Sequence, residues 1–157
     1  MKLFIDGDST SAHVIDICLK AHSGGRVKVV YVGDRLSGKI KDSDAEKIIV
    51  SSGSGKTDSI ILDKSGSGDI AVTADLYLAR ELIVNNVTAI SPYGKIWEKK
   101  SLEKRIKDSE IMRAMRNGGI VRFKGKRFSA TDKENFANTL DHILSLRGAE
   151  YADNRNT

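Results

Sequence analysis

Acidic side chains follow three of the short apolar runs in this sequence. Asp6 and Asp8 come directly after the first run. Asp75 follows the fourth run, and Asp58 lies shortly after the third. Carboxylates that crowd together repel one another unless a cation lies among them, and Mg²⁺ and Mn²⁺ prefer such hard oxygen ligands. One or two of these ions would activate a water molecule and stabilise a phosphoryl oxygen during in-line displacement.

Each aspartate also has a purely structural interpretation. Aspartate after a strand is a common loop residue and helix N-cap, so Asp75 is also explained as the cap of the helix that follows it. Asp69 precedes its apolar run, at the opposite end from the other acids, and we interpret it as structural. The metal hypothesis therefore depends on Asp6, Asp58 and Asp75 converging in the fold.

The elements that must position these acids alternate between two patterns. Short runs rich in β-branched residues predict strands at 2–5, 27–32, 47–51, 69–73 and 87–90. Helical periodicity predicts helices near 14–21, 56–63, 75–84 and 101–116, and a last helix capped by Thr131 or Asp132. The stretch 33–46 is polar and predicted to be irregular.

This alternation implies βαβ units, which indicate a three-layer α/β/α fold with a mostly parallel sheet of about five strands and two C-terminal helices. Such sheets bind ligands beyond the carboxyl ends of their strands. We predict a single domain over residues 1–148, followed by a flexible polar tail at 149–157.

The amino-acid composition limits the class of protein and the cellular location that the chain is expected to have. Of 157 residues, 39% are hydrophobic, enough for a core without crosslinks. Cys18 is the only cysteine, so an intramolecular disulfide is excluded and a reducing, cytoplasmic location is predicted. No stretch approaches the roughly 20 apolar residues of a membrane span, so no membrane partner is expected.

Positive charge is concentrated in one segment. Residues 95–127 contain twelve Lys and Arg against four Asp and Glu, while the whole chain has a net charge of +5. This asymmetry suggests an anionic partner such as RNA, although a solvated basic surface explains it equally well. Tyr93 and Trp97 lie beside the segment and suit either base stacking or packing. The candidate nucleic-acid contacts are Lys56, Lys99, Lys100, Lys104, Arg113, Arg116, Arg122, Lys124, Lys126 and Arg127.

Two other motifs in the sequence resemble those of phosphate-handling proteins. The triplet 55–57 resembles the end of a P-loop, but Val50 stands where the first glycine of that motif belongs. The run 6–10 has the pattern D-x-D-x-T of haloacid-dehalogenase-type phosphatases, in which Asp6 would be the nucleophile and Asp8 an acid/base. The final acidic motif of those phosphatases follows a strand, whereas Asp69 precedes one.

The chain resembles the YaiI/YqxD family of uncharacterised bacterial proteins, whose fold is similar to PIN-like nuclease domains. Four stretches carry the resemblance, at 6–8, 57–60, 68–79 and 136–144, and the segments 91–94 and 112–119 also fit. By this resemblance, the wider PIN-like class implies that Asp6, Asp58 and Asp75 bind Mg²⁺ or Mn²⁺ and that Asp8 is a fourth catalytic acid. The family usually reads D-A-D-A-C-P at this point, whereas this chain has Ser9-Thr10-Ser11 after its acids, so any role of that cysteine is absent.

The sequence therefore predicts a metal-dependent nuclease that acts on RNA, with catalytic residues Asp6, Asp8, Asp58 and Asp75. A non-catalytic nucleic-acid-binding or protein-binding module on the same fold is the first alternative, and the phosphatase is the second. Assembly into a homo-oligomer is left open.

Overall fold

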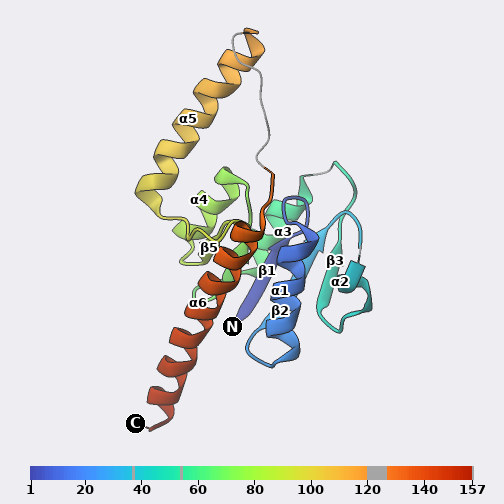
Figure 1. Ribbon diagram of the computed structural model, residues 1–157, viewed down its shortest axis with the longest axis vertical. Helices are drawn as coiled ribbons and strands as arrows, with labels where there is room; N and C mark the ends of the chain where they lie inside the picture. The colour runs from blue at the N-terminus through green and yellow to red at the C-terminus, as the bar shows by residue number, and fades with distance from the viewer. Residues whose placement is uncertain (37, 54, 120–126, 157) are drawn as a thin grey trace.

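The computed structural model describes residues 1–36, 38–53, 55–119 and 127–156, with side chains as far as Glu150. The described residues form one sheet of five parallel strands in the order β3-β2-β1-β4-β5 (Figure 1). The strands are β1 (Lys2–Asp6), β2 (Lys28–Gly33), β3 (Glu46–Ile49), β4 (Ile70–Val72) and β5 (Thr88–Ile90).

Helices cover both faces of this sheet. They are α1 (Ala12–Ser23), α2 (Gly38–Asp42), α3 (Lys56–Lys64), α4 (Leu76–Val84), α5 (Lys99–Asn117) and α6 (Ala130–Asn156). Buried residues of α1, α2 and α6 share one hydrophobic cluster with the sheet, and those of α3, α4 and α5 share the other. This arrangement confirms the predicted three-layer α/β/α fold.

The alternation of side chains along β1 explains the two clusters. Leu3 and Ile5 pack on the face covered by α1 and α6, whereas Phe4 packs on the face covered by α3 and α4. All three side chains are at most 1% exposed. A parallel strand buried on both faces reads as a continuous apolar run, which is the pattern that predicted these strands.

Two local predictions were wrong. The short helix α2 lies within the stretch 33–46, because a single buried residue, Ile40, anchors it and leaves no visible periodicity. The N-cap of α6 is Ser129 rather than Thr131 or Asp132, since the Ser129 hydroxyl accepts a hydrogen bond from the Asp132 amide and the Asp132 carboxylate accepts one from the Ser129 amide. This reciprocal pair is a capping box.

The helices at the C-terminal end of the chain reach beyond the body of the protein. The buried side chains of Leu102 and Ile106 pack the first half of α5 against the body of the protein. The second half of α5 extends away from it as an arm (Figure 1). Glu110 ties the middle of this arm to α4, because its carboxylate accepts a hydrogen bond of 2.8 Å from the Tyr77 hydroxyl. Helix α6 continues through residues 149–156, for which the sequence predicts a polar tail.

Within the described part of the chain, the helices are all too short or too polar to cross a bilayer.

The order of the strands creates a switch point at the carboxyl edge of the sheet. The chain moves from β1 outward to β2 and β3, then returns to the other side of β1 for β4 and β5. The connections that leave β1 and β4 therefore diverge, and ligands of open α/β sheets bind in the crevice formed at such points. Asp6 ends β1 and Thr73 directly follows β4, so both lie at this crevice.

Candidate functional site

Asp6 is the most constrained acid of the carboxyl edge. Its side chain is 2% exposed, and its Oδ2 accepts hydrogen bonds from the Thr73 hydroxyl at 2.7 Å and the Ser9 hydroxyl at 2.8 Å. Its Oδ1 accepts one from the Asp8 amide at 3.1 Å. Burial raises the pKa of Asp6, and these hydrogen bonds oppose that rise. The carboxylate is thus held in one orientation, with lone pairs still available for a further ligand.

Thr73 connects Asp6 to the second acid of the site. The Thr73 hydroxyl donates to Asp6 and also accepts a hydrogen bond of 3.0 Å from the amide of Asp75. Oδ1 of Asp75 in turn accepts from the amides of Tyr77 and Leu78, at 2.9 and 3.1 Å. The interpretation of Asp75 as the N-cap of α4 is therefore confirmed, and its backbone amide is linked to Asp6 through the single hydroxyl group of Thr73.

Asp58 reaches the same place from the first turn of α3. The pKa of this half-buried carboxyl rises to about 6, first because burial disfavours its charge and then because of the charges of Asp75, Asp6 and Asp8. Asp8 itself is exposed. Asp58 therefore lies within electrostatic range of the other three acids that the sequence singled out, although the four come from three separate segments.

The excluded acid, Asp69, lies at the opposite edge of the sheet. Its two carboxylate oxygens accept hydrogen bonds from the amides of Lys2 and Gly66, at 2.9 and 3.0 Å. Its structural interpretation is confirmed.

The arrangement of the four acids decides how they could bind a metal ion. In the described part of the chain, no three His, Cys, Asp or Glu side chains are arranged to hold a metal ion. Hard carboxylate oxygens are nevertheless the donors that Mg²⁺ prefers, and this ion is commonly bound by one or two carboxylates together with substrate phosphates. The partly exposed acids Asp8, Asp58 and Asp75 fit this shared mode of binding, and they do not form a preassembled three-carboxylate centre.

A cleft of about 480 Å³ opens beside Asp8, between the ends of β1 and β2. Its lining includes Gly7, Asp8, Thr10, Tyr31, Asp34 and Arg35. The Tyr31 ring lies against the backbone of Gly7 and Gly33, where an added Cβ would lie 2.4 and 2.9 Å from the tyrosine oxygen. The Tyr31 hydroxyl donates to the Arg35 carbonyl at 2.9 Å. Two glycines thus let a tyrosine line the cleft.

Trp97 supports the site from within the protein. It is 6% exposed, and its Nε1 donates a hydrogen bond of 3.1 Å to the carbonyl of Thr73. The guanidinium of Arg105 lies 5.4 Å from the centre of the ring system, and the ammonium of Lys95 lies 6.0 Å from it. Of its two sequence interpretations, packing is therefore the one that the structure confirms.

Sequence reasoning did not identify Ser9, Thr73, Tyr31 or Trp97 as parts of this site. The two hydroxyl residues stand next to predicted strand ends, which was a usable signal. The contact of Tyr31 with Gly7 joins segments that are distant in sequence, and no local sequence pattern predicts it.

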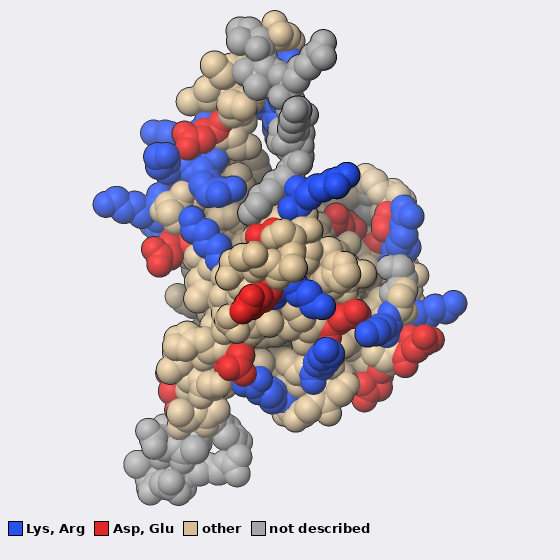
Figure 2. Space-filling view, viewed as in Figure 1, with Lys and Arg blue, Asp and Glu red and all other residues tan. Residues whose placement is uncertain are grey.

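The basic candidates lie in several separate parts of the chain. Lys99, Lys100 and Lys104 are exposed on the first turns of α5, and Lys104 pairs with Asp108 at 3.2 Å. Arg113 and Arg116 lie farther along the same arm, where Figure 2 shows several basic side chains in blue.

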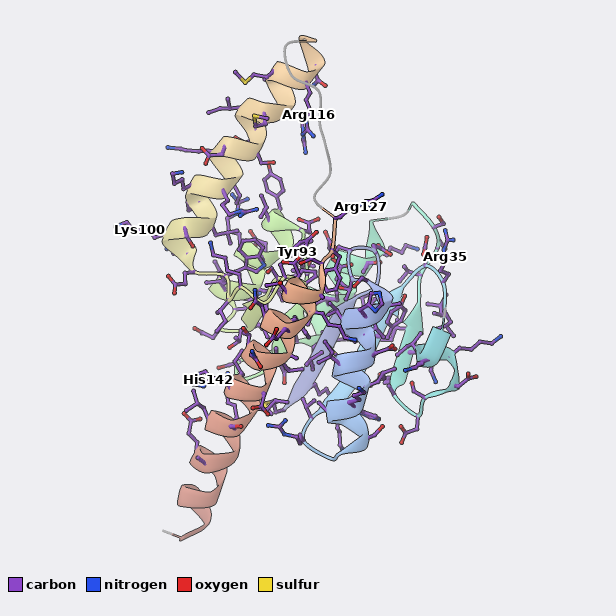
Figure 3. The ribbon with its side chains drawn as sticks, viewed as in Figure 1. Arg35, Tyr93, Lys100, Arg116, Arg127 and His142 are labelled. Atoms are coloured by element: carbon purple, nitrogen blue, oxygen red, sulfur yellow. The ribbon has the colours of Figure 1, made fainter. Side chains whose placement is uncertain are left out.

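Arg127 is exposed just before α6 (Figure 3). Lys56 is exposed at the start of α3, next to Asp58 in sequence. The remaining candidates, Arg122, Lys124 and Lys126, lie outside the described residues.

Comparisons with known proteins agree on one family. The family model described as uncharacterised, YaiI/YqxD family, matches residues 4–146. A UPF0178 protein of Desulfotalea psychrophila is 28% identical over 145 residues, covering 92% of this chain and 98% of the relative. A UPF0178 protein of Vibrio cholerae is 30% identical over 147 residues, covering 94% of this chain and 99% of the relative. No solved structure matches the chain.

Proposed function

We propose that this chain, which belongs to the uncharacterised YaiI/YqxD family, is a nuclease that uses Mg²⁺ or Mn²⁺ and acts on RNA. The observation that carries the proposal is that Asp6, Asp8 and Asp75 lie within electrostatic range of Asp58, at the carboxyl edge of a parallel sheet near its switch point. Burial and, after it, repulsion by the other three acids raise the pKa of Asp58 and cost stability, and such costs cluster at functional sites. A bound divalent cation would offset this repulsion.

The proposed role of each acid follows from how exposed its side chain is to solvent. Asp58 and Asp75, both partly exposed, would hold the ion together with a phosphate of the substrate, and Asp6 would complete the set through its remaining lone pairs. The ion would supply charge stabilisation to the phosphoryl group and lower the pKa of a bound water. Asp8, exposed beside the cleft, would orient the attacking water.

The pKa of about 6 belongs to Asp58 without an ion, and a cation bound to its carboxylate would lower that pKa, so we assign Asp58 as a ligand of the ion. The Thr73 and Ser9 hydroxyls fix the orientation of the Asp6 carboxylate, which would keep that ligand rigid during the reaction.

The basic residues support an anionic, extended substrate. Lys99 and Lys100 on α5, Arg127 before α6 and Arg35 beside the cleft are exposed cations. Cations of this kind contact phosphates independently of base sequence. They would bind successive phosphates of the nucleic-acid strand while the acids act on one phosphodiester.

A non-catalytic nucleic-acid-binding module remains the second candidate, and one observation favours it. Both carboxylate oxygens of Asp6 already accept hydrogen bonds from the protein, so the site is satisfied without an ion. The phosphatase alternative needs Asp6 as an attacking nucleophile, and a side chain that is 2% exposed and fixed by three hydrogen bonds is poorly suited to that role.

Cleavage of a fluorescent single-stranded oligoribonucleotide tests the proposal, with DNA of the same sequence in parallel. Reactions with Mg²⁺, Mn²⁺ or chelator are compared for the wild type, Asp58→Asn and Asp75→Asn. The matched control is Asp63→Asn, which removes an exposed charge from the same helix α3.

We expect ion-dependent cleavage that falls about a hundredfold in Asp58→Asn, because the ion loses one of its ligands, and stays unchanged in the control. Cleavage that persists in both site variants would contradict the proposal. Binding without any cleavage would favour the binding module.

A further inference from the structure

Three aromatic rings from distant parts of the chain meet at the carboxyl edge of the sheet. His13 lies in the first turn of α1, Tyr93 in the turn that follows β5, and Phe128 just before α6. The His13 and Phe128 rings are parallel within 5°, with centroids 6.0 Å apart. The Tyr93 ring lies 5.9 Å from that of Phe128 at 44°. We call these three residues the aromatic cluster.

The aromatic cluster is only partly covered by protein. Phe128 packs its inner side against the core below α1 and α6. His13 is exposed, and Tyr93 and Phe128 are half-buried. The cluster therefore presents ring surface to solvent while it is anchored from beneath.

The turn that carries Tyr93 is held rigidly against α6. Gly94 has φ +90°, and a Cβ at this position would lie 2.5 Å from the carbonyl carbon of Asn135. The Gly94 carbonyl accepts a hydrogen bond of 2.6 Å from the hydroxyl of Thr139. The Ser91 hydroxyl accepts from the amide of Tyr93 at 3.3 Å. A ring that is already immobilised loses little entropy when a ligand stacks on it, which favours binding.

The surroundings of the aromatic cluster are basic and lie near the acids. Arg127 precedes Phe128 directly and is exposed, so it is one residue away from the ring that lies beside Tyr93. His13 belongs to the helix that follows the loop at residues 7–11, and the Thr10 hydroxyl of that loop donates to the Asp6 carbonyl at 2.7 Å. Stacking rings, cations and carboxylates therefore share one edge of the sheet.

We propose that the aromatic cluster stacks on an unpaired base of a single-stranded nucleic acid, while Arg127 contacts the adjoining phosphate. A base in a duplex is stacked on its neighbours and does not offer its face, so the partner is single-stranded. Every base has a π-face, and binding of this kind is tolerant of sequence. The inference deepens the proposed function by naming the strandedness of its substrate, and the binding step itself needs no cleavage.

Fluorescence anisotropy in the presence of chelator tests the inference without any reaction. The probes are labelled twelve-residue oligouridylate, an abasic strand of the same length, and a duplex. The variants are His13→Ala and Tyr93→Leu, and the control is His142→Ala, which removes an exposed histidine farther along α6 (Figure 3). Far-ultraviolet circular dichroism and melting curves confirm that each variant is folded.

We expect His13→Ala and Tyr93→Leu to weaken oligouridylate binding about tenfold, the usual loss of one stacked base, and to leave abasic binding and the control unchanged. Equal losses on the abasic strand, no loss on oligouridylate, or preference for the duplex would overturn the inference. Cleavage that is lost only in Asp58→Asn, with oligouridylate binding intact in His13→Ala, would overturn the stacking inference and leave the nuclease proposal standing. Stacking-dependent binding without cleavage would support the stacking inference and overturn the nuclease proposal.

Discussion

Replacing Asp58 by asparagine should make the protein more stable at neutral pH. The pKa of Asp58 rises from 3.8 to about 6 in the folded state because burial and the charges of Asp75, Asp6 and Asp8 disfavour its ionised form. A shift of two pKa units corresponds to ~3 kcal/mol in full. Since the side chain is partly exposed and solvent screens such interactions, we expect Asp58→Asn to raise the free energy of unfolding by ~1 kcal/mol at pH 7.5.

The sign of the pH dependence follows from the same shift. Below pH 3.8 Asp58 is protonated in both the folded and the unfolded chain, so it carries no penalty. As pH rises through the folded pKa of about 6, the penalty becomes complete and the wild type loses stability relative to the variant. Most of the gain in Asp58→Asn should therefore vanish at pH 4.0.

Urea denaturation at pH 7.5 and pH 4.0 measures this difference, with Asp63→Asn on the exposed side of α3 as the matched control. A gain of the same size at both pH values would refute the reasoning, because it would not arise from ionisation of Asp58. A loss of stability at pH 7.5 would refute it as well, since the neighbouring acids would then not oppose that charge.

Three further changes test the construction of the site by urea denaturation. Asp75→Ala should lower the free energy of unfolding by ~1 kcal/mol because it removes the N-cap of α4, whereas Asp75→Asn keeps the cap and should change it by a few tenths at most; equal effects would contradict the cap. Thr73→Val should cost ~1–3 kcal/mol because Oδ2 of buried Asp6 loses its hydrogen bond of 2.7 Å, and a neutral result would show that the hydroxyl does not hold the carboxylate. Gly94→Ala should cost ~2 kcal/mol or more because φ is +90° and the new Cβ would collide with the backbone at Asn135; an unchanged midpoint would mean that the turn is not seated on α6.

The convergence of the acids could be predicted because parallel strands place their carboxyl ends at one edge. Asp6 and Asp75 follow strands, and Asp58 opens a helix, so each was marked by its place in the alternating pattern. Asp69 was excluded by the same argument, and its position at the opposite edge agrees. The strand order, which makes β1 and β4 neighbours, has no such local signal.

Features that join distant segments could not be read from the sequence. The aromatic cluster brings His13 next to Phe128 across most of the chain, and the hydrogen bond from Trp97 to Thr73 crosses from one loop to another. Short elements are also hard to predict, since α2 has one buried residue, Ile40, and no period to detect. Local patterns therefore fix which residues end a strand, and packing decides which of those ends touch.

Calorimetric titration of Mn²⁺ into metal-free protein tests the central claim most directly, alone and with a single-stranded oligonucleotide present. The wild type is compared with the double variant Asp58→Asn/Asp75→Asn, which removes two of the proposed ligands and retains the cap of α4. The account predicts saturable binding that is strengthened by the oligonucleotide and lost in the double variant. Binding of equal strength in the double variant, or no binding by the wild type under either condition, would contradict it.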